Sequence, residues 1–90
     1  MTGTSPQAYP GYATPVITRE DQADGRWIVG ADPWKVLVGW IDQHAAGWTA
    51  YAPRVVNGVA TGVGLYVGLF PDQKAAGEAL VKHAGYEVLR

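Results

Sequence analysis

The chain contains no cysteine, so it forms no disulfide, presents no thiolate nucleophile and offers no thiolate ligand to zinc. The sequence therefore does not indicate whether the protein works in an oxidising or a reducing compartment. An excess of positive charge is also missing, because seven Lys and Arg stand against eight Asp and Glu, a formal net charge of −1. This balance argues against attachment to nucleic acid or anionic lipid through bulk electrostatics.

Long apolar runs are absent as well, and none approaches the roughly 20 residues that a membrane-spanning helix needs. Residues 1–15 have neither the basic start nor the apolar run of a secretory signal peptide. We therefore expect a cytoplasmic protein with no membrane partner. The richness in Ala, Gly and Val, with little Ile, Lys or Asn, is typical of a high-GC bacterium or one of its phages.

The residue combinations of common enzymes are missing too. The single serine, Ser5, lies in the N-terminal tail, and no pair of acidic residues suggests acid–base catalysis. His44 and His83 are predicted near helix ends, where the helix dipole favours a cation. No carboxylate has a metal-ligand spacing to either histidine. We expect no enzyme, no metal and no cofactor, and a deep polar pocket around a histidine would revive the enzyme hypothesis.

What is present fits one small domain of 90 residues with a thin core, reinforced by four Trp and five Tyr. Residues 1–25 are predicted to be a flexible or extended arm that Tyr9, Tyr12 and Pro15 could dock onto a neighbour. Residues 26–90 form the domain. Within the arm, Val16-Ile17-Thr18 is β-prone and could pair with a strand at residues 26–30 through a turn at Asp24-Gly25.

The stretch from Trp48 to Phe70 carries the clearest local signal, because Asn57-Gly58 lies between two valine-containing segments. Asn-Gly is the strongest short hairpin signal, since a type I′ turn needs a positive φ at both central residues. The stretch is therefore predicted to be one long antiparallel hairpin in which Val56 pairs with Val59.

Without a bulge, this turn fixes the register of the hairpin and divides its residues between two faces. The face assigned to the core pairs Trp48 with Val67, Ala50 with Leu65, Ala52 with Val63 and Arg54 with Thr61. The other face pairs Thr49 with Tyr66, Tyr51 with Gly64, Pro53 with Gly62 and Val55 with Ala60. A bulge would shift the register and exchange the faces of one strand. Since Pro53 has no backbone N–H, its strand is predicted at a sheet edge.

A helix is predicted on each side of the hairpin. The first begins at Asp32-Pro33 and ends before Gly47, because Asp suits the N-cap and Pro the first helical position. Its apolar stripe is Trp34, Leu37, Val38, Ile41 and Ala45, widened by Val36 and Trp40, and Gly39 would allow close approach to the sheet. The second begins at Pro71-Asp72 and ends at Gly85. Its buried stripe is predicted to be Ala75, Ala76, Ala79, Leu80 and His83 or Ala84.

Tyr86–Leu89 is predicted to be the last strand, which completes the order β-α-β-β-α-β over residues 26–90. Right-handed crossovers then give an α+β fold, a four-stranded antiparallel sheet ordered 4-1-3-2 with two helices on one face. This order places the Pro53 strand at an edge. The pattern resembles the ferredoxin-like group, and two helices on one side would leave the other face of the sheet open.

Three local resemblances point to known domain families. The C-terminal half, with Gly68-Leu69-Phe70 followed by Ala76, Leu80 and Gly85, resembles the repeat of SPOR domains, which implies peptidoglycan binding. The first half has no matching Gly-x-Phe. Residues 61–67 stand where RNA-recognition domains carry their signature, although Thr61, Val63 and Leu65 replace its basic and stacking residues. A third pattern resembles AP2-type DNA-binding domains and consists of Trp48, Gly68-Leu69-Phe70, Ala76 and Ala79. Those domains use basic sheet residues, and Arg54 is the one available here.

An open sheet face lined by glycine and tyrosine suggests a site for a partner, since flat glycine-lined faces allow close approach. The candidate binding residues are Tyr51, Val55, Tyr66, Phe70 and Arg54. The alternative is that the tyrosines cover glycines within the sheet and bind nothing. Trp27 or Trp40 would add to the surface or belong to the core.

The function expected from these residues is a small non-enzymatic module that binds a partner protein or a second copy of itself. The alternative is a domain for single-stranded nucleic acid that stacks bases on Tyr51 and Tyr66, with phosphate contacts from Arg26, Arg54 and Arg90. The net charge disfavours the nucleic acid.

Overall fold

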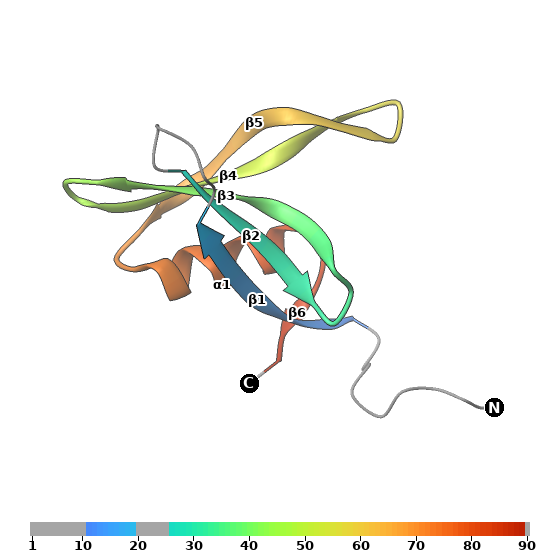
Figure 1. Cartoon of the computed structure of the whole chain (residues 1–90), viewed down its shortest axis with the longest axis horizontal. Helices are drawn as coiled ribbons and strands as arrows, with labels where there is room; N and C mark the ends of the chain where they lie inside the picture. Colours follow the sequence, from blue (N-terminus) through green and yellow to red (C-terminus); the bar gives the residue numbers. More distant parts are fainter. Residues whose placement is uncertain (1–10, 20–25, 90) are drawn as a thin grey trace.

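The computed structural model of the chain describes residues 11–19 and 26–89, with side chains for all of these except residues 55, 56 and 60–63. Within these residues, five strands are followed by a helix and a short last strand (Figure 1). The elements are β1 (Tyr12–Arg19), β2 (Trp27–Asp32), β3 (Val36–His44), β4 (Gly47–Val56), β5 (Val59–Phe70), α1 (Gln73–His83) and β6 (Glu87–Val88).

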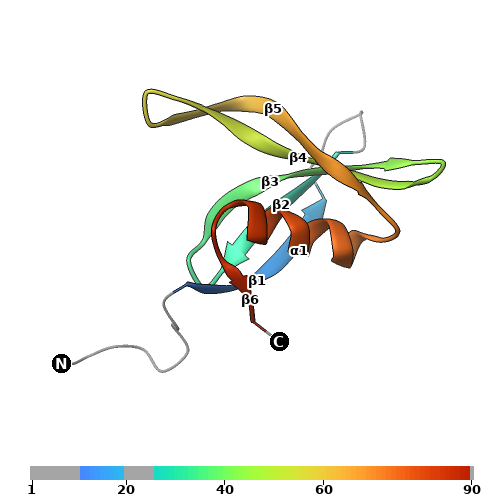
Figure 2. The ribbon, with the colours of Figure 1, turned by 180° about the vertical axis from the view of Figure 1, so that it is seen from behind.

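The described strands form one mixed sheet in the order β5-β4-β3-β2-β1-β6. β1 to β5 are an antiparallel meander, whereas β6 pairs in parallel with β1 through Tyr12–Glu87 and Ala13–Val88. The sheet curls into a half-barrel, and α1 lies against its concave side (Figures 1 and 2). We call the side that faces α1 the inner face and the opposite side the outer face.

This architecture contradicts the predicted ferredoxin-like fold of four strands and two helices. The described residues contain one helix, and the segment predicted as the first helix forms the end of β2, a turn and β3. Residues 12–19, expected as part of an arm, form β1 and pair with β2 from Thr14–Asp32 to Arg19–Trp27. The pairing expected for Val16-Ile17-Thr18 is confirmed, while Tyr9 and the Asp24-Gly25 turn lie outside the described residues.

The helix prediction for residues 32–46 failed because its signals also fit a strand and a turn. Asp32-Pro33 opens a tight turn that Lys35 closes, with the Lys35 N–H donating to the Ala31 carbonyl at 2.8 Å. The residues that follow, Val36 to Ile41, are rich in β-branched and aromatic types, which pack well on a pleated sheet. A helical spacing of apolar residues therefore coincided with a strand buried on its inner face.

Gly39 is a point of close approach between β3, β4 and α1. A Cβ atom at this position would lie 2.2 Å from the Tyr51 carbonyl oxygen and 2.9 Å from a Leu80 methyl carbon. The close approach expected of Gly39 thus exists, but it brings a strand against α1. The buried residues of the core are Ala13, Val29, Ala31, Val38, Ile41, Ala50, Ala52, Ala76, Leu80 and Val81.

The β4–β5 hairpin forms as predicted at its turn and departs from the prediction along its length. Asn57 and Gly58 both have positive φ, and the predicted pairs Val56–Val59, Val55–Ala60 and Arg54–Thr61 are present. Beyond them the register shifts three times, so that Tyr51 pairs with Tyr66 and Trp48 with Phe70. The residues skipped in β5 are Gly62, Gly64 and Val67. Two of these three bulges are at glycines, which commonly mark bulges inside strands.

Pro53 does not lie on an edge strand, because β4 is between β3 and β5. The β3–β4 ladder, however, runs from His44–Gly47 only as far as Trp40–Tyr51. In a two-residue hairpin the pair beside the turn is hydrogen-bonded, and bonded pairs recur at every second residue. Pro53 is the next position in β4 that turns its backbone towards β3, and it has no N–H to donate. The β3–β4 ladder ends there because proline cannot donate a hydrogen bond, which is also why Pro53 was predicted on an edge strand.

The helix predicted after Pro71-Asp72 is confirmed as α1. The Asp72 carboxylate accepts a hydrogen bond from the Ala75 N–H at 2.8 Å, an N-cap contact, and Gly85 has a φ of 102° just beyond the helix. The buried stripe is Ala76, Gly77, Leu80 and Val81, so it is rotated from the predicted one, and His83 and Ala84 are exposed. No helix in the described part of the chain is long and apolar enough to cross a membrane.

Candidate interaction face on the outer side of the sheet

A row of large side chains crosses the outer face from strand to strand. Ile28 of β2 pairs with Trp40 of β3, Trp40 with Tyr51 of β4, and Tyr51 with Tyr66 of β5. Paired residues in an antiparallel sheet point to the same face, and the neighbours Val29, Ile41 and Ala50 are buried against α1. We call the four residues Ile28, Trp40, Tyr51 and Tyr66 the outer row. The outer row therefore points away from the helix.

The two tyrosines at the end of this row are in direct contact. Their ring centroids are 6.0 Å apart and their planes meet at 66°, an edge-to-face geometry. Tyr66 is 62% exposed and Tyr51 is half-buried beneath it. The structure thus brings together the two tyrosines named from the sequence, but through the Tyr51–Tyr66 pairing that the bulges create and not through the predicted pairing of Tyr51 with Gly64.

The other candidate binding residues lie elsewhere. Phe70 pairs with Trp48 and packs against the core on the inner side, so it does not share a face with the tyrosines. Arg54 is exposed in the part of β4 that extends beyond β3. The backbone of Val55 pairs with Ala60, and the Val55 side chain lies outside the described structure.

From the sequence, Trp40 was expected either on this surface or in the core, and Leu37 was expected in the apolar stripe of the predicted helix. Ile28 was not a candidate. The structure places Trp40 half-buried in the outer row, and Leu37, 45% exposed, on the same face opposite Gly30. A period-two alternation would place Leu37 and Ile41, which are four residues apart, on the same face of a strand. The bulge at Val38 instead puts Leu37 on the outer face and Ile41 on the inner face, and no alternation pattern in the sequence reveals it.

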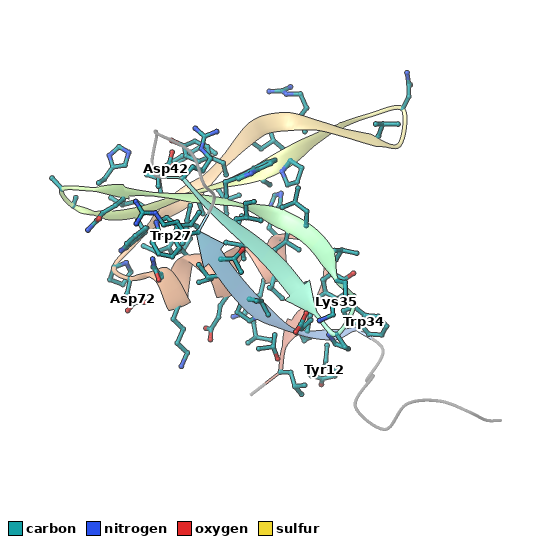
Figure 3. The ribbon with its side chains drawn as sticks, in the orientation of Figure 1. Tyr12, Trp27, Trp34, Lys35, Asp42 and Asp72 are labelled. Atoms are coloured by element: carbon teal, nitrogen blue, oxygen red, sulfur yellow. The ribbon has the colours of Figure 1, made fainter. Side chains whose placement is uncertain are left out.

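Charged groups on the outer face are balanced in pairs. The Arg26 guanidinium lies 3.3 Å from the Asp42 carboxylate, and Lys35 lies 3.2 Å from Asp32. The two pairs are at opposite ends of the face (Figure 3). Four exposed apolar or aromatic side chains share the face with them: Val16, Leu37, Tyr66 and Leu69. The outer face therefore combines exposed apolar side chains with two balanced ion pairs.

One hollow lies on this face, and a second lies between β3 and β4 and reaches the end of α1. The first lies over Gly30, whose missing side chain leaves a depression of about 360 Å³ between Val16, Ile28 and Leu37. The second has a volume of about 470 Å³ and opens where β3 and β4 separate. Its lining is Leu37, Val38, Ala52, Pro53, Leu65, His83 and Ala84. We call this second hollow the notch.

The surroundings of the histidines do not resemble a catalytic pocket. His83 is at the mouth of the notch, and every other residue that lines the notch is apolar. His44 is exposed at the β3–β4 turn. Among the described residues, no three His, Asp or Glu side chains are grouped so that they could hold a metal ion.

Comparison of the chain with protein families, with curated proteins and with solved structures found no match.

Proposed function

We propose that this protein is a small non-enzymatic interaction module that binds a partner protein through the outer face of its sheet. The observation that carries the proposal is the outer row of Ile28, Trp40, Tyr51 and Tyr66, which spans four neighbouring strands. Within the described residues the helix packs on the inner face, and no other element lies over the row.

An aromatic face of this kind suits protein recognition. Tyrosine and tryptophan are enriched at protein interfaces, because each supplies a large contact area with few rotatable bonds and retains one polar group. Exposed apolar patches on small domains commonly mark binding surfaces. Leu37 and Leu69, each close to half exposed, extend the patch on either side of the row.

Single-stranded nucleic acid is less well matched to the same face. Base stacking on Trp40, Tyr51 and Tyr66 would be possible, but binding also needs cations that follow the phosphate backbone. Arg26 and Lys35, the cations beside the outer face, are each held by a carboxylate. The net charge of −1 adds no attraction. A protein partner is therefore the occupant that we propose, and the cytoplasmic location expected from the sequence stays a prediction.

The test is site-specific photo-crosslinking in cells of the source organism. A photoreactive phenylalanine analogue replaces Tyr66 in one variant and Lys74, an exposed residue of α1, in a control. We expect irradiation to give a protein adduct from position 66 that is absent from position 74. Mass spectrometry of the adduct identifies the partner.

Three other outcomes would each contradict the proposal in a different way. The same adducts from both positions would show that the outer face has no special role. An adduct that nuclease removes would favour the nucleic-acid alternative. An adduct containing only a second copy of the chain, together with dimers in light scattering, would replace the partner protein by self-association.

A further inference from the structure

The sheet divides into two parts at the notch. β3 and β4 are paired from the His44–Gly47 turn to Trp40–Tyr51, and beyond this pair the two strands separate. The C-terminal half of β4, beyond Tyr51, continues with β5 as a two-stranded ribbon. The start of β3 continues with β2 in another direction (Figures 1 and 2). The notch lies in the angle between them, and its floor is the C-terminal end of α1 at His83 and Ala84.

The start of β3 presents an open backbone edge to the notch. Val36 and Leu37 pair with Ala31 and Gly30 of β2 on one side. On the other side no strand of the described residues pairs with them. An edge of this kind carries N–H and C=O groups that an extended peptide can pair with, the interaction known as β-strand addition. The facing stretch of β4 is a poorer template, since Pro53 has no N–H.

The notch is lined by apolar residues and His83, and the charged residues next to these in sequence, Arg54 and Lys82, are basic. Leu37 and Leu65, each 45% exposed, line the notch together with Ala52 and Pro53. The volume of about 470 Å³ is within the range of pockets that bury a bound group. His83 lines the mouth, and Arg54 and Lys82 are adjacent in sequence to lining residues, whereas no carboxylate lines the notch. Charge complementarity therefore favours a ligand with acidic residues beside an apolar one.

We propose that the notch binds an extended segment of the partner protein, which pairs as an added strand with β3 at Val36–Val38. One apolar side chain of the segment fills the notch between Leu37, Pro53 and Leu65, and an acidic residue beside it faces His83. This inference rests on the proposed interaction function and specifies the partner's chemistry: an extended, acidic and apolar peptide segment.

The experiment uses the full chain and a phage-displayed library of random dodecapeptides. Enriched peptides are synthesised with a fluorescent label, and their affinities are measured by anisotropy. We expect enriched sequences to combine a Leu, Ile or Phe with neighbouring Asp or Glu. Leu37→Asn and His83→Glu should each weaken binding at least about tenfold, the size expected when a central interface contact is lost.

Matched controls separate the notch from general surface effects. Val59→Asn makes the same kind of change as Leu37→Asn at an exposed valine beside the β4–β5 turn, and Lys74→Glu reverses a charge on the other part of α1. Both should bind the peptides within about twofold of the parent chain. Circular dichroism confirms that each variant is folded. Amide hydrogen exchange tests the strand pairing, because bound peptide should slow exchange at Val36–Val38.

The proposal is overturned if no peptide is enriched, if enriched peptides bind Leu37→Asn as well as the parent chain, or if bound peptide leaves exchange at Val36–Val38 unchanged. These results would leave the proposed function in place, since its test depends on adducts formed from position 66 by a native partner. Conversely, peptides that bind the notch while position 66 gives no adduct would support a peptide site without an interface at the outer row.

Discussion

Tyr51 and Tyr66 lie opposite each other on β4 and β5, with their rings in edge-to-face contact at a centroid distance of 6.0 Å. The pairing depends on two bulges in β5 at Gly62 and Gly64, which lie between the hairpin turn and the tyrosines. A ladder without these bulges would have placed Gly64 opposite Tyr51. The contact at the end of the outer row is thus a product of irregularities in the strand.

The first prediction concerns the energy of this tyrosine contact. Edge-to-face aromatic pairs contribute about 0.5–1.5 kcal/mol beyond the area that they bury. We expect a double-mutant cycle with Tyr51→Ala, Tyr66→Ala and the double variant to give a coupling energy in this range, measured by urea unfolding. Additive effects of the two substitutions would show that the rings do not interact in solution.

The second prediction concerns the close approach at Gly39. Gly39→Ala would place a Cβ atom 2.2 Å from the Tyr51 carbonyl oxygen and within 3.0 Å of both Leu80 methyl carbons. The Tyr51 backbone on one side and the buried Leu80 side chain on the other leave the added Cβ atom little room. We expect a loss of about 2–3 kcal/mol in the free energy of unfolding, the cost of overpacking a core.

Gly30→Ala is the matched control for this substitution. A Cβ atom at Gly30 would lie 3.4 Å from its nearest neighbour, the Val36 carbonyl oxygen, an ordinary contact on the outer face. This change should alter stability by less than about 1 kcal/mol. Similar thermal shifts for the two variants would mean that Gly39 is not a point of close packing between β3 and α1.

The third prediction concerns the start of α1. The Asp72 carboxylate accepts the Ala75 N–H, so Asp72→Ala leaves a helix N–H without its cap. The expected cost is about 1 kcal/mol. Asp72→Asn keeps a side-chain oxygen at the same position and should recover most of this loss. If thermal unfolding shows Asn to be as destabilising as Ala, the contact is not an N-cap.

The fourth prediction concerns the cluster that joins the β2–β3 turn to β1 and to the segment between α1 and β6. The Trp34 indole N–H donates to the Tyr12 carbonyl at 2.7 Å, and its ring stacks on Tyr86 at a centroid distance of 6.3 Å (Figure 3). Trp34→Phe removes the hydrogen bond while it keeps an aromatic ring, and should cost about 1 kcal/mol. Trp34→Ala removes both contacts and should cost more.

Urea unfolding monitored by circular dichroism measures both Trp34 variants. Equal losses for Phe and Ala would indicate that stacking on Tyr86 contributes nothing to stability. No loss for Phe would indicate that the carbonyl of Tyr12 is satisfied by water when the indole is absent.

The candidate interaction face was only partly predictable from the sequence. Tyr51 and Tyr66 were named as candidates because they are in a glycine-rich hairpin, yet Phe70, chosen with them, packs on the inner side. Trp40 is in the outer row because residues 36–44 form a strand. The same residues also fitted a helical stripe, and only packing against β2, β4 and α1 distinguishes the two.

Local chemistry was sufficient for the features that depend on a few adjacent residues. Asn57-Gly58 determines the β4–β5 turn because both residues tolerate positive φ, and Asp72 and Gly85 determine where α1 begins and ends. These signals act within one turn of the backbone, so no distant contact has to be known.

The tertiary structure decided what depends on distant partners. It selected a strand for Val36–His44 because the inner face could then bury Val38 and Ile41 against Leu80. It also selected the bulges at Gly62 and Gly64, which bring Tyr66 opposite Tyr51. A strand's register and curvature are determined by the surface that the strand covers, and that surface is assembled from residues far apart in the chain.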